Sequence, residues 1–393
     1  EDAASSAPTI RLVNSIIERA ANERASDIHV EPGELELRIR MRIDGVMQEI
    51  LTVPKDIQSS VISRIKIMSA MDIAERRVPQ DGRFNVRIKE KDFDLRVSTL
   101  PTVYGEKIVA RLLDKSGGRI SMEQIGLSED EIAPIRKLLN CRNGVILVVG
   151  PTGSGKTTTM YSMINEMNRR EVNLVTLEDP VEYNIDGINQ VQINEKIGMT
   201  FASGLRSILR QDPDIIAVGE IRDGETAEIA MRSAITGHVV LSTLHANDAL
   251  GTVERLIDMG VEPYLVASAL KGVFSQRLVR RICPNCRKTY NPTEEEQSEL
   301  GLPYDPERVF YHGTGCPECF DTGYRGRTAV FEIFPLSVQV RRLIAKGANR
   351  EEIEALLKDP ASGFVSLREN AIRLVENGTT TASELLRVIY EDI

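Results

Sequence analysis

Residues 150–157, with the sequence GPTGSGKT, constrain the fold of this chain more than any other segment. They fit the phosphate-loop pattern G-x-x-x-x-G-K-[ST]. They also lie between an apolar run at 145–149, which predicts a buried strand, and a predicted helix at 158–168. The glycines let successive backbone N–H groups face a β-phosphate, and the helix N-terminus adds partial positive charge. The sequence therefore predicts a site for a nucleoside triphosphate.

The side chains of this phosphate loop have separate expected roles. Lys156 reaches the β- and γ-phosphate oxygens, and the hydroxyl of Thr157 ligates Mg²⁺. A chance glycine-rich turn is the alternative, and the flanking strand and helix argue against it. The predicted contacts to the nucleotide are Gly150, Pro151, Thr152, Gly153, Ser154, Gly155, Lys156, Thr157 and Thr158.

The composition narrows the class of protein. The chain has 393 residues, of which 41% are apolar and 27% charged, as is ordinary for a globular protein of two or three domains. It has no apolar run of membrane-spanning length and no signal-peptide pattern, so we expect a cytoplasmic protein. Its net charge of −9 and its lack of tryptophan disfavour a nucleic-acid partner. Because the chain opens at Glu1 without methionine, we expect a further N-terminal part.

Four of the five cysteines form two C-x-x-C pairs, Cys283 with Cys286 and Cys316 with Cys319. In a cytosolic chain such pairs predict four thiolate ligands of one tetrahedral zinc ion. Four thiolates leave no open position on the metal, so the expected role is structural, and a redox pair is the alternative. We expect the fifth cysteine, Cys141, to be a small buried apolar side chain.

The first part of the chain, residues 1–115, predicts an α+β domain. Two helical patterns, at 12–24 and 54–70, accompany six short strand-like runs in hairpin order. Residues 116–127 contain two adjacent glycines and predict a flexible linker.

The second part, residues 128–393, alternates predicted strands and helices. This alternation predicts a mostly parallel sheet covered on both faces. The predicted strands lie at 145–149, 173–177, 215–219 and 239–244. After Gly260 we expect a helical chain, interrupted by the cysteine insert at 283–319.

Polar residues follow three of these strands, and the carboxyl ends of parallel strands meet at the same edge of a sheet as the phosphate loop. Carboxylates there hold Mg²⁺ through water or place the attacking water, and an imidazole there hydrogen-bonds to the γ-phosphate. We therefore expect Glu220, Glu178 and His245 to be catalytic together with Lys156, and His238 to contact the nucleotide. Asp179 is the alternative to Glu178. A solvated carboxylate or a structural imidazole is the alternative for each.

Five arginines are further candidates for nucleotide contacts. Ring-shaped motors close each nucleotide site with arginines from a neighbouring subunit or domain, because a guanidinium binds phosphate oxygens in a bidentate manner. Simple solvation of the surface is the alternative for each one. The candidates are Arg83, Arg96 and Arg111 of the first domain, and Arg206 and Arg210, one turn apart on a predicted helix at 201–210.

Longer motifs around these residues resemble those of the GspE/PilB family of secretion ATPases, the motors of type II secretion and type IV pilus assembly. Gly219 stands where many motors place a second acid, so Mg²⁺ depends on Thr157 and on carboxylates acting through water. The matching segments are a Walker A motif at 150–157, an aspartate box at 176–183, a Walker B motif at 209–223, a histidine box at 236–246, and signatures of the second N-terminal domain at 25–32 and 79–83.

The resemblance implies an α/β fold in which a PAS-like N-terminal domain is joined flexibly to a RecA-like P-loop ATPase domain with a tetracysteine zinc subdomain. It implies a homohexamer that binds ATP between the domains, with Mg²⁺ and Zn²⁺ as cofactors. Glu220 is then the catalytic glutamate, and Glu178 contacts Mg²⁺ through water. The implied partner is an inner-membrane platform protein, which would hold the motor at the inner face of the bacterial inner membrane.

Pilus-retraction relatives lack the tetracysteine site, so the resemblance favours assembly or export. The overall likeness favours pilin polymerisation in type IV pilus assembly, with type II secretion as the alternative. A nucleic-acid motor with the same core and a non-hydrolysing nucleotide switch are more distant alternatives. The acidic charge argues against the first, and the polar strand ends argue against the second.

Overall fold

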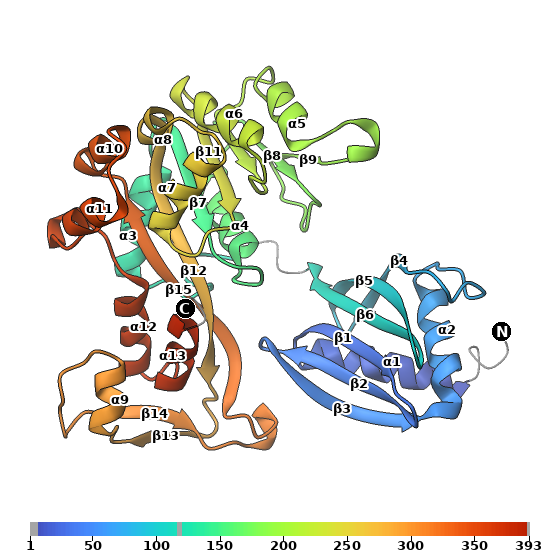
Figure 1. Cartoon of the computed structure of the whole chain (residues 1–393). Helices are drawn as coiled ribbons and strands as arrows, with labels where there is room; N and C mark the ends of the chain where they lie inside the picture. The colour runs from blue at the N-terminus through green and yellow to red at the C-terminus, as the bar shows by residue number, and fades with distance from the viewer. Residues whose placement is uncertain (1–6, 116–119, 391–393) are drawn as a thin grey trace. The chain divides into compact units, whose positions relative to one another are not determined.

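The computed structural model describes residues 7–115 and 120–390. They belong to two compact units, Glu1–Gly117 and Gly118–Ile393. Figure 1 shows the helices and strands of both units.

The predicted linker falls at the junction of the two units. The two adjacent glycines of the linker, Gly117 and Gly118, lie outside the described residues. Its later part packs within the second unit, because Met122 and Leu127 are buried among apolar side chains of that unit. The second unit therefore begins earlier along the chain than the expected boundary at Ser128.

Within residues 7–115 a six-stranded antiparallel sheet has the order β3-β2-β1-β6-β5-β4 and packs one face against two helices. Alternation along β5 sets the two faces: Phe93, Leu95 and Val97 are buried in the core, whereas Asp94 and Arg96 belong to the opposite face. All six expected strands are present. The elements are α1 (Ala7–Asn22), β1 (Ala25–Pro32), β2 (Glu36–Ile43), β3 (Val46–Pro54), α2 (Gln58–Met68), β4 (Gln80–Ile88), β5 (Lys91–Thr102) and β6 (Gly105–Asp114).

Within residues 120–390 a seven-stranded sheet has the order β15-β12-β7-β11-β10-β8-β9. Its strand pairs are parallel except for β12 and β15, so the predicted α/β fold is confirmed. The strands are β7 (Gly144–Val149), β8 (Leu174–Glu178), β9 (Asn189–Gln192), β10 (Ile215–Val218), β11 (Val239–Leu244), β12 (Leu270–Ile282) and β15 (Tyr324–Pro335), with a separate hairpin of β13 (Arg287–Tyr290) and β14 (Phe310–Gly313). The helices are α3 (Glu129–Leu139), α4 (Lys156–Met167), α5 (Phe201–Ile208), α6 (Gly224–Ile235), α7 (Ala249–Asp258), α8 (Pro263–Ala269), α9 (Glu294–Glu299), α10 (Val338–Ala345), α11 (Arg350–Leu357), α12 (Leu367–Glu376) and α13 (Ala382–Tyr390).

The expectation of a helical chain after Gly260 is wrong for β12 and β15. These long strands pair with each other from Gly272 to Ile282, and β12 also pairs with β7. Residues 272–277 of β12 are all buried. A strand buried on both faces loses the alternation of apolar and polar residues that identifies a strand in sequence.

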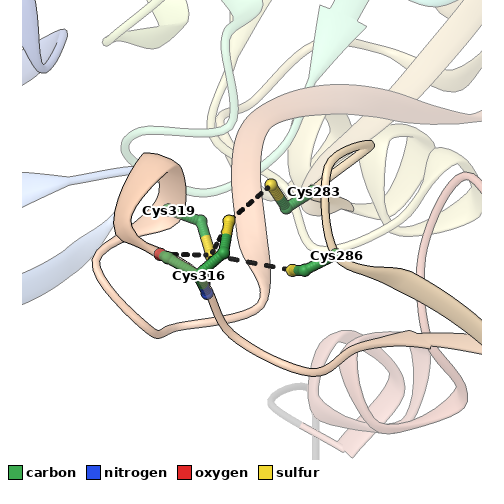
Figure 2. Close-up of side chains that lie close together, drawn as sticks. All are labelled: Cys283, Cys286, Cys316 and Cys319. Carbon is green, nitrogen blue, oxygen red and sulfur yellow. Dashed lines mark hydrogen bonds between the residues drawn. The ribbon is translucent and has the colours of Figure 1, made fainter.

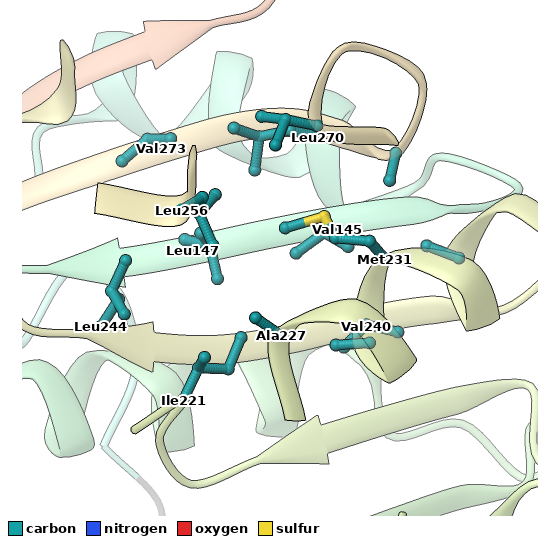
Figure 3. Close-up of a cluster of buried hydrophobic side chains, with 14 of the residues drawn as sticks. Val145, Leu147, Ile221, Ala227, Met231, Val240, Leu244, Leu256, Leu270 and Val273 are labelled. Atoms are coloured by element: carbon teal, nitrogen blue, oxygen red, sulfur yellow. The ribbon is translucent and has the colours of Figure 1, made fainter. Parts of the chain in front are cut away.

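Strand β7 lies in the middle of the sheet and is buried on both faces. Val145 and Leu147 belong to one apolar core, and Ile146 and Val148 belong to the core on the other side. Figure 3 shows part of the first core, where β7 side chains lie among those of α6, α7 and β12. Burying each such side chain stabilises the fold by about 1.5–3 kcal/mol. The two cores therefore fix β7, and with it the start of the phosphate loop.

The β12–β15 ribbon continues past the end of β7. Pairing of β12 with β7 ends at Ser275, whereas its pairing with β15 runs on to Ile282. Helices α12 and α13 pack against this extension through a separate apolar cluster that includes Val279 and Val330. The ribbon leads from the phosphate loop to the cysteine segment. Among the described residues, no helix has both the length and the apolar character needed to cross a bilayer.

Candidate nucleotide-hydrolysis site and tetracysteine cluster

The phosphate loop joins β7 to α4 and is shaped by three glycines with positive φ, Gly150 at 145°, Gly153 at 80° and Gly155 at 88°. A Cβ at Gly150 would lie 2.5 Å from the backbone oxygen of Gln276, and one at Gly155 would lie 2.8 Å from its side-chain Nε2. Gln276 is buried on β12, where it accepts a hydrogen bond from Thr159 and donates one to the Ser154 carbonyl, both at 2.7 Å. Strand β12 therefore holds the phosphate loop and the first turn of α4 through Gln276.

Two polar groups of the loop are suited to bind phosphate. The Ser154 hydroxyl is buried and has no hydrogen-bond partner among the described residues. The Lys156 amine donates to the carbonyls of Gly150 at 2.8 Å and Pro151 at 2.9 Å. Burial lowers the pKa of Lys156 to about 8, with a further lowering from Arg277 against an opposing effect of Glu220. This amine can exchange its carbonyl partners for the oxygens of a triphosphate.

A cavity of about 240 Å³ opens between the phosphate loop and the carboxyl ends of β8, β10 and β11. It brings together most of the residues that the sequence singles out for hydrolysis. The predicted residues that line it are Thr152, Gly153, Lys156, Thr157, Glu178, Glu220 and His245, and they are joined by Met160, Asp179, Pro180, Glu182, Phe201, Gly219 and Thr243.

Glu178 lies at the end of β8 and is 3% exposed. One carboxylate oxygen accepts from the Tyr161 hydroxyl, and the other accepts from Thr176 and, at 3.1 Å, from Gln190 Nε2. The Tyr161 hydroxyl also accepts from the backbone N–H of Glu182 at 3.1 Å. Burial and the neighbouring carboxylate raise the pKa of Tyr161. Both oxygens of Glu178 are thus held by protein donors.

Glu220 follows β10 and is more accessible, with 21% of its side chain exposed. The guanidinium of Arg222 contacts its carboxylate and reaches Asp179 at 3.3 Å. His245, which follows β11, places Nε2 3.6 Å from the other oxygen of Glu220. Burial, followed by the charge of Lys156, lowers the pKa of His245, so its imidazole is neutral at physiological pH. Glu220 therefore faces the cavity with a neutral imidazole beside it.

Of the nucleotide contacts predicted in the second unit, five at or beside the phosphate loop (Gly150, Pro151, Ser154, Gly155 and Thr158) and three elsewhere do not line this cavity. The three lie away from the loop. His238 is at the amino end of β11, the end opposite the cavity, and its ring nitrogen lies 2.9 Å from the Ser233 carbonyl. Arg206 pairs with Glu225 on α6, and Arg210 donates to the Arg206 carbonyl at 2.9 Å. A nucleotide contact from any of the three stays a prediction.

The three arginines of the first unit form a cross-strand row. Arg83 lies directly opposite Arg96, and Arg96 directly opposite Arg111, on β4, β5 and β6. Asp27 of β1 continues the row and accepts from Arg111 Nε at 3.1 Å. The sequence predicted three arginines on strands, and the register brings them side by side on the face opposite the helices.

Four cysteine sulfurs gather among the described residues of the second unit, as Figure 2 shows. All four lie within 4.8 Å of one another. The closest sulfur pairs are Cys283–Cys316 and Cys286–Cys319 at 3.8 Å and Cys316–Cys319 at 3.6 Å. Tetrahedral zinc with Zn–S bonds of about 2.3 Å requires sulfurs about 3.8 Å apart. The cluster therefore fits a zinc ion held by four thiolates.

Several residues of the site escaped the sequence analysis. Tyr161, Thr176 and Gln190 hold Glu178, and Gln276 and Arg222 hold the loop and Glu220. A buried tyrosine hydroxyl and a buried glutamine both need hydrogen-bond partners, but nothing in the sequence indicates which partners they find.

Comparison with known proteins identifies one matching family and three similar relatives. A family model described as Type II/IV secretion system protein matches residues 2–387. Type II secretion system protein E of Aeromonas hydrophila is 48% identical over 391 residues, which cover 100% of this chain and 77% of the relative. Type IV pilus assembly ATPase PilB of Myxococcus xanthus is 48% identical over 390 residues, with 98% and 68% covered. Type II secretion system ATPase E of Vibrio cholerae is 45% identical over 385 residues, with 98% and 76% covered.

Solved structures share the fold. The ATPase DotB of Legionella pneumophila has a TM-score of 0.71 at 20% identity, over 97% of this chain and 95% of that chain. The pilus retraction motor PilT with bound ADP has a TM-score of 0.64 at 27% identity, over 95% and 96%.

Proposed function

The chain belongs to the family of type II/IV secretion system proteins, and on this premise we propose that it is a homohexameric motor that drives pilin polymerisation in type IV pilus assembly. It is an ATPase, as its relatives PilB and ATPase E are. The observation that carries the proposal is the cavity in which Lys156, Glu220 and His245 meet.

We propose that ATP binds with its phosphates along residues 150–157. The Lys156 amine leaves the two loop carbonyls and binds phosphate oxygens, joined by backbone N–H groups of the loop. The Thr157 hydroxyl, exposed in the cavity, is the group that would hold Mg²⁺, with Glu178 acting through water, and the ion would neutralise phosphate charge. These groups place and polarise the triphosphate, which is most of what its hydrolysis needs.

Glu220 is the better candidate for the group that places and deprotonates the attacking water. Glu178 has both oxygens engaged by protein donors, whereas Glu220 faces the cavity with 21% of its side chain exposed. His245 is neutral and lies beside Glu220. It can therefore donate a hydrogen bond to the γ-phosphate without forming an ion pair with the Glu220 carboxylate. Loss of the γ-phosphate would then change the contacts of Glu220 and His245, which follow β10 and β11.

The mechanical part of the proposal rests on arginine chemistry. We propose that Arg83, Arg96 and Arg111 of the first unit bind the triphosphate, from the same or a neighbouring subunit, when ATP is present. Release of ADP and phosphate removes that attraction, so each cycle closes and opens the two units. A ring of subunits would transmit this motion to an inner-membrane platform protein, which holds the motor at the inner face of the membrane.

The tetracysteine cluster is proposed to hold structural zinc and favours an assembly or export motor over retraction. Relatives named for type II secretion and for pilus assembly are both 48% identical, so identity alone does not separate the two pathways. Type II secretion is therefore the second candidate. Deleting the gene in its source bacterium tests this: loss of surface pili with intact protein secretion supports the proposal. Lost secretion with intact pili supports the second candidate.

A further inference from the structure

The segment between β11 and α7 carries His245 and is held by residues far along the chain. The carbonyl of Asn247 accepts from Arg277 Nη2 at 2.6 Å, and Arg277 is buried on β12. The backbone N–H of Ala249 donates to Glu332 of β15 at 2.8 Å. Each contact falls within four residues of His245, so the path of the segment is set by the C-terminal strands.

Asp248 in this segment forms an ion pair with Arg350, the first residue of α11. Arg350 Nη2 lies 2.6 Å from one carboxylate oxygen and Nη1 lies 3.4 Å from the other, while Nε binds Glu354 at 2.7 Å. Asp248 is also the N-cap of α7 and accepts from the N–H of Gly251. One carboxylate thus starts α7 and binds α11, which fixes both the direction of the helix and the end of the segment.

Glu332 adds a second fixed point. Its carboxylate accepts from the N–H of Ala249 at the start of α7 and from the N–H of Leu367 at the start of α12. A carboxylate at two helix N-termini is favoured by the partial positive charge of both. The segment is therefore tied to β12, β15, α11 and, through Glu332, α12.

We propose that Arg277, Glu332 and Arg350, named here the α7 anchor, are positioning residues that keep His245 beside Glu220 and so couple the C-terminal helices to ATP hydrolysis. This inference rests on the proposed roles of His245 and Glu220. The α7 anchor contacts Asn247, Asp248 and Ala249, and it acts on His245 through the backbone of this segment. A shift of α11 would move Asp248, and with it the imidazole three residues earlier.

A double-mutant cycle on the full chain tests the coupling between Arg350 and Asp248. Asp248→Asn keeps a good N-cap but removes the charge that Arg350 binds. We expect Arg350→Gln and Asp248→Asn each to lower kcat about tenfold with KM for ATP nearly unchanged, because a displaced group of the site costs rate rather than binding. The double variant should lose no more than either single one. Additive losses would overturn the pairing.

A second experiment separates positioning from simple stabilisation. In a His245→Ala background, Arg350→Gln should have no further effect on kcat, whereas a merely destabilising change would still lower it. Arg232→Gln, which removes an exposed arginine paired with Glu228 on α6, should keep normal turnover. Thermal unfolding checks that each variant folds.

Two results distinguish the proposed role of His245 from that of the α7 anchor. If His245→Ala itself hydrolyses ATP normally, the proposed role of His245 is wrong. If His245→Ala is slow but a folded Arg350→Gln hydrolyses at the wild-type rate, the α7 anchor proposal alone is overturned.

Discussion

His245 places Nε2 3.6 Å from Oε2 of Glu220, at the ends of two adjacent parallel strands. The two residues are 25 positions apart in the sequence (245 − 220). Parallel pairing of β10 with β11 brings them to the same edge of the sheet. Burial lowers the pKa of His245, so a neutral imidazole lies beside Glu220. This relation makes Glu220 the centre of the proposed hydrolysis.

The zinc content of the purified protein tests whether the four clustered cysteines bind a metal ion. Purified protein should carry about one zinc ion per chain, held by four thiolates. Cys286→Ser should lower the zinc content and the stability more than it lowers nucleotide affinity, because the cluster is not part of the cavity wall. Cys141→Ser, a half-buried cysteine outside the cluster, should keep its zinc. Elemental analysis that finds no metal in freshly purified, reduced, folded protein would contradict the assignment.

Nucleotide affinity should depend on the protonation of Lys156. The pKa of Lys156 is about 8 in the nucleotide-free protein, and the protonated amine binds phosphate. Below pH 8 this group leaves the affinity unchanged. Above it the free amine is neutral, so binding must take up a proton, and the affinity should fall by up to about tenfold per pH unit.

Calorimetry in two buffers with different ionisation enthalpies measures that proton uptake. Lys156→Arg keeps its charge throughout this range and should bind ATP with no such dependence, whatever its absolute affinity. A wild-type affinity that is constant from pH 7 to about pH 9.5, with no proton uptake, would refute the lowered pKa of Lys156.

Tyr161→Phe should destabilise the fold and slow hydrolysis. The change removes a donor to buried Glu178 and an acceptor for the N–H of Glu182. Leaving such groups unpaired costs about 1–3 kcal/mol in the free energy of unfolding. Denaturant unfolding measures this cost, and Tyr264→Phe, at an exposed tyrosine, is the matched control. Equal stability of the two variants would show that the Tyr161 hydroxyl does not support Glu178.

The local motifs of this site could be predicted from the sequence, because each depends on neighbours in the chain. The phosphate loop needs a strand before it and a helix after it, and the cysteine pairs need only two residues between thiolates. Glu220 and His245 were identified because they follow apolar strands. His238 precedes its strand and lies at the end opposite the cavity, so its nucleotide contact stays a prediction.

The contacts that hold these motifs could not be predicted, because they join residues distant in the chain. Thr159 meets Gln276 across 117 positions, and Arg350 meets Asp248 across 102. Many polar residues of the chain could have served as the partner of Thr159 or of Asp248. The pairing of β12 with β7 selects Gln276, and the packing of α11 selects Arg350. The strands β12 and β15 were missed for a related reason: burial on both faces hides their period.

The arginine row of the first unit is expected to be needed for ATP hydrolysis in an assembled ring of subunits. Arg96→Ala should lose hydrolysis while remaining folded, and wild-type activity should rise steeply with protein concentration until rings form. Arg87→Ala, an exposed arginine on β4 paired with Asp92, should remain active. If the arginine acts across subunits, mixing Arg96→Ala with Glu220→Gln should restore some turnover. An Arg83, Arg96 and Arg111 triple alanine variant with normal turnover would contradict the arginine proposal.

The most direct test of the account is ATP binding and hydrolysis by Glu220→Gln. The amide keeps the size of the side chain but cannot accept a proton from water, so we expect nearly intact ATP affinity and hydrolysis lowered by about 10³-fold or more. Lys156→Ala, measured alongside, should weaken both binding and hydrolysis. If Glu220→Gln hydrolyses ATP near the wild-type rate, Glu220 does not activate the water, and Glu178 becomes the better candidate.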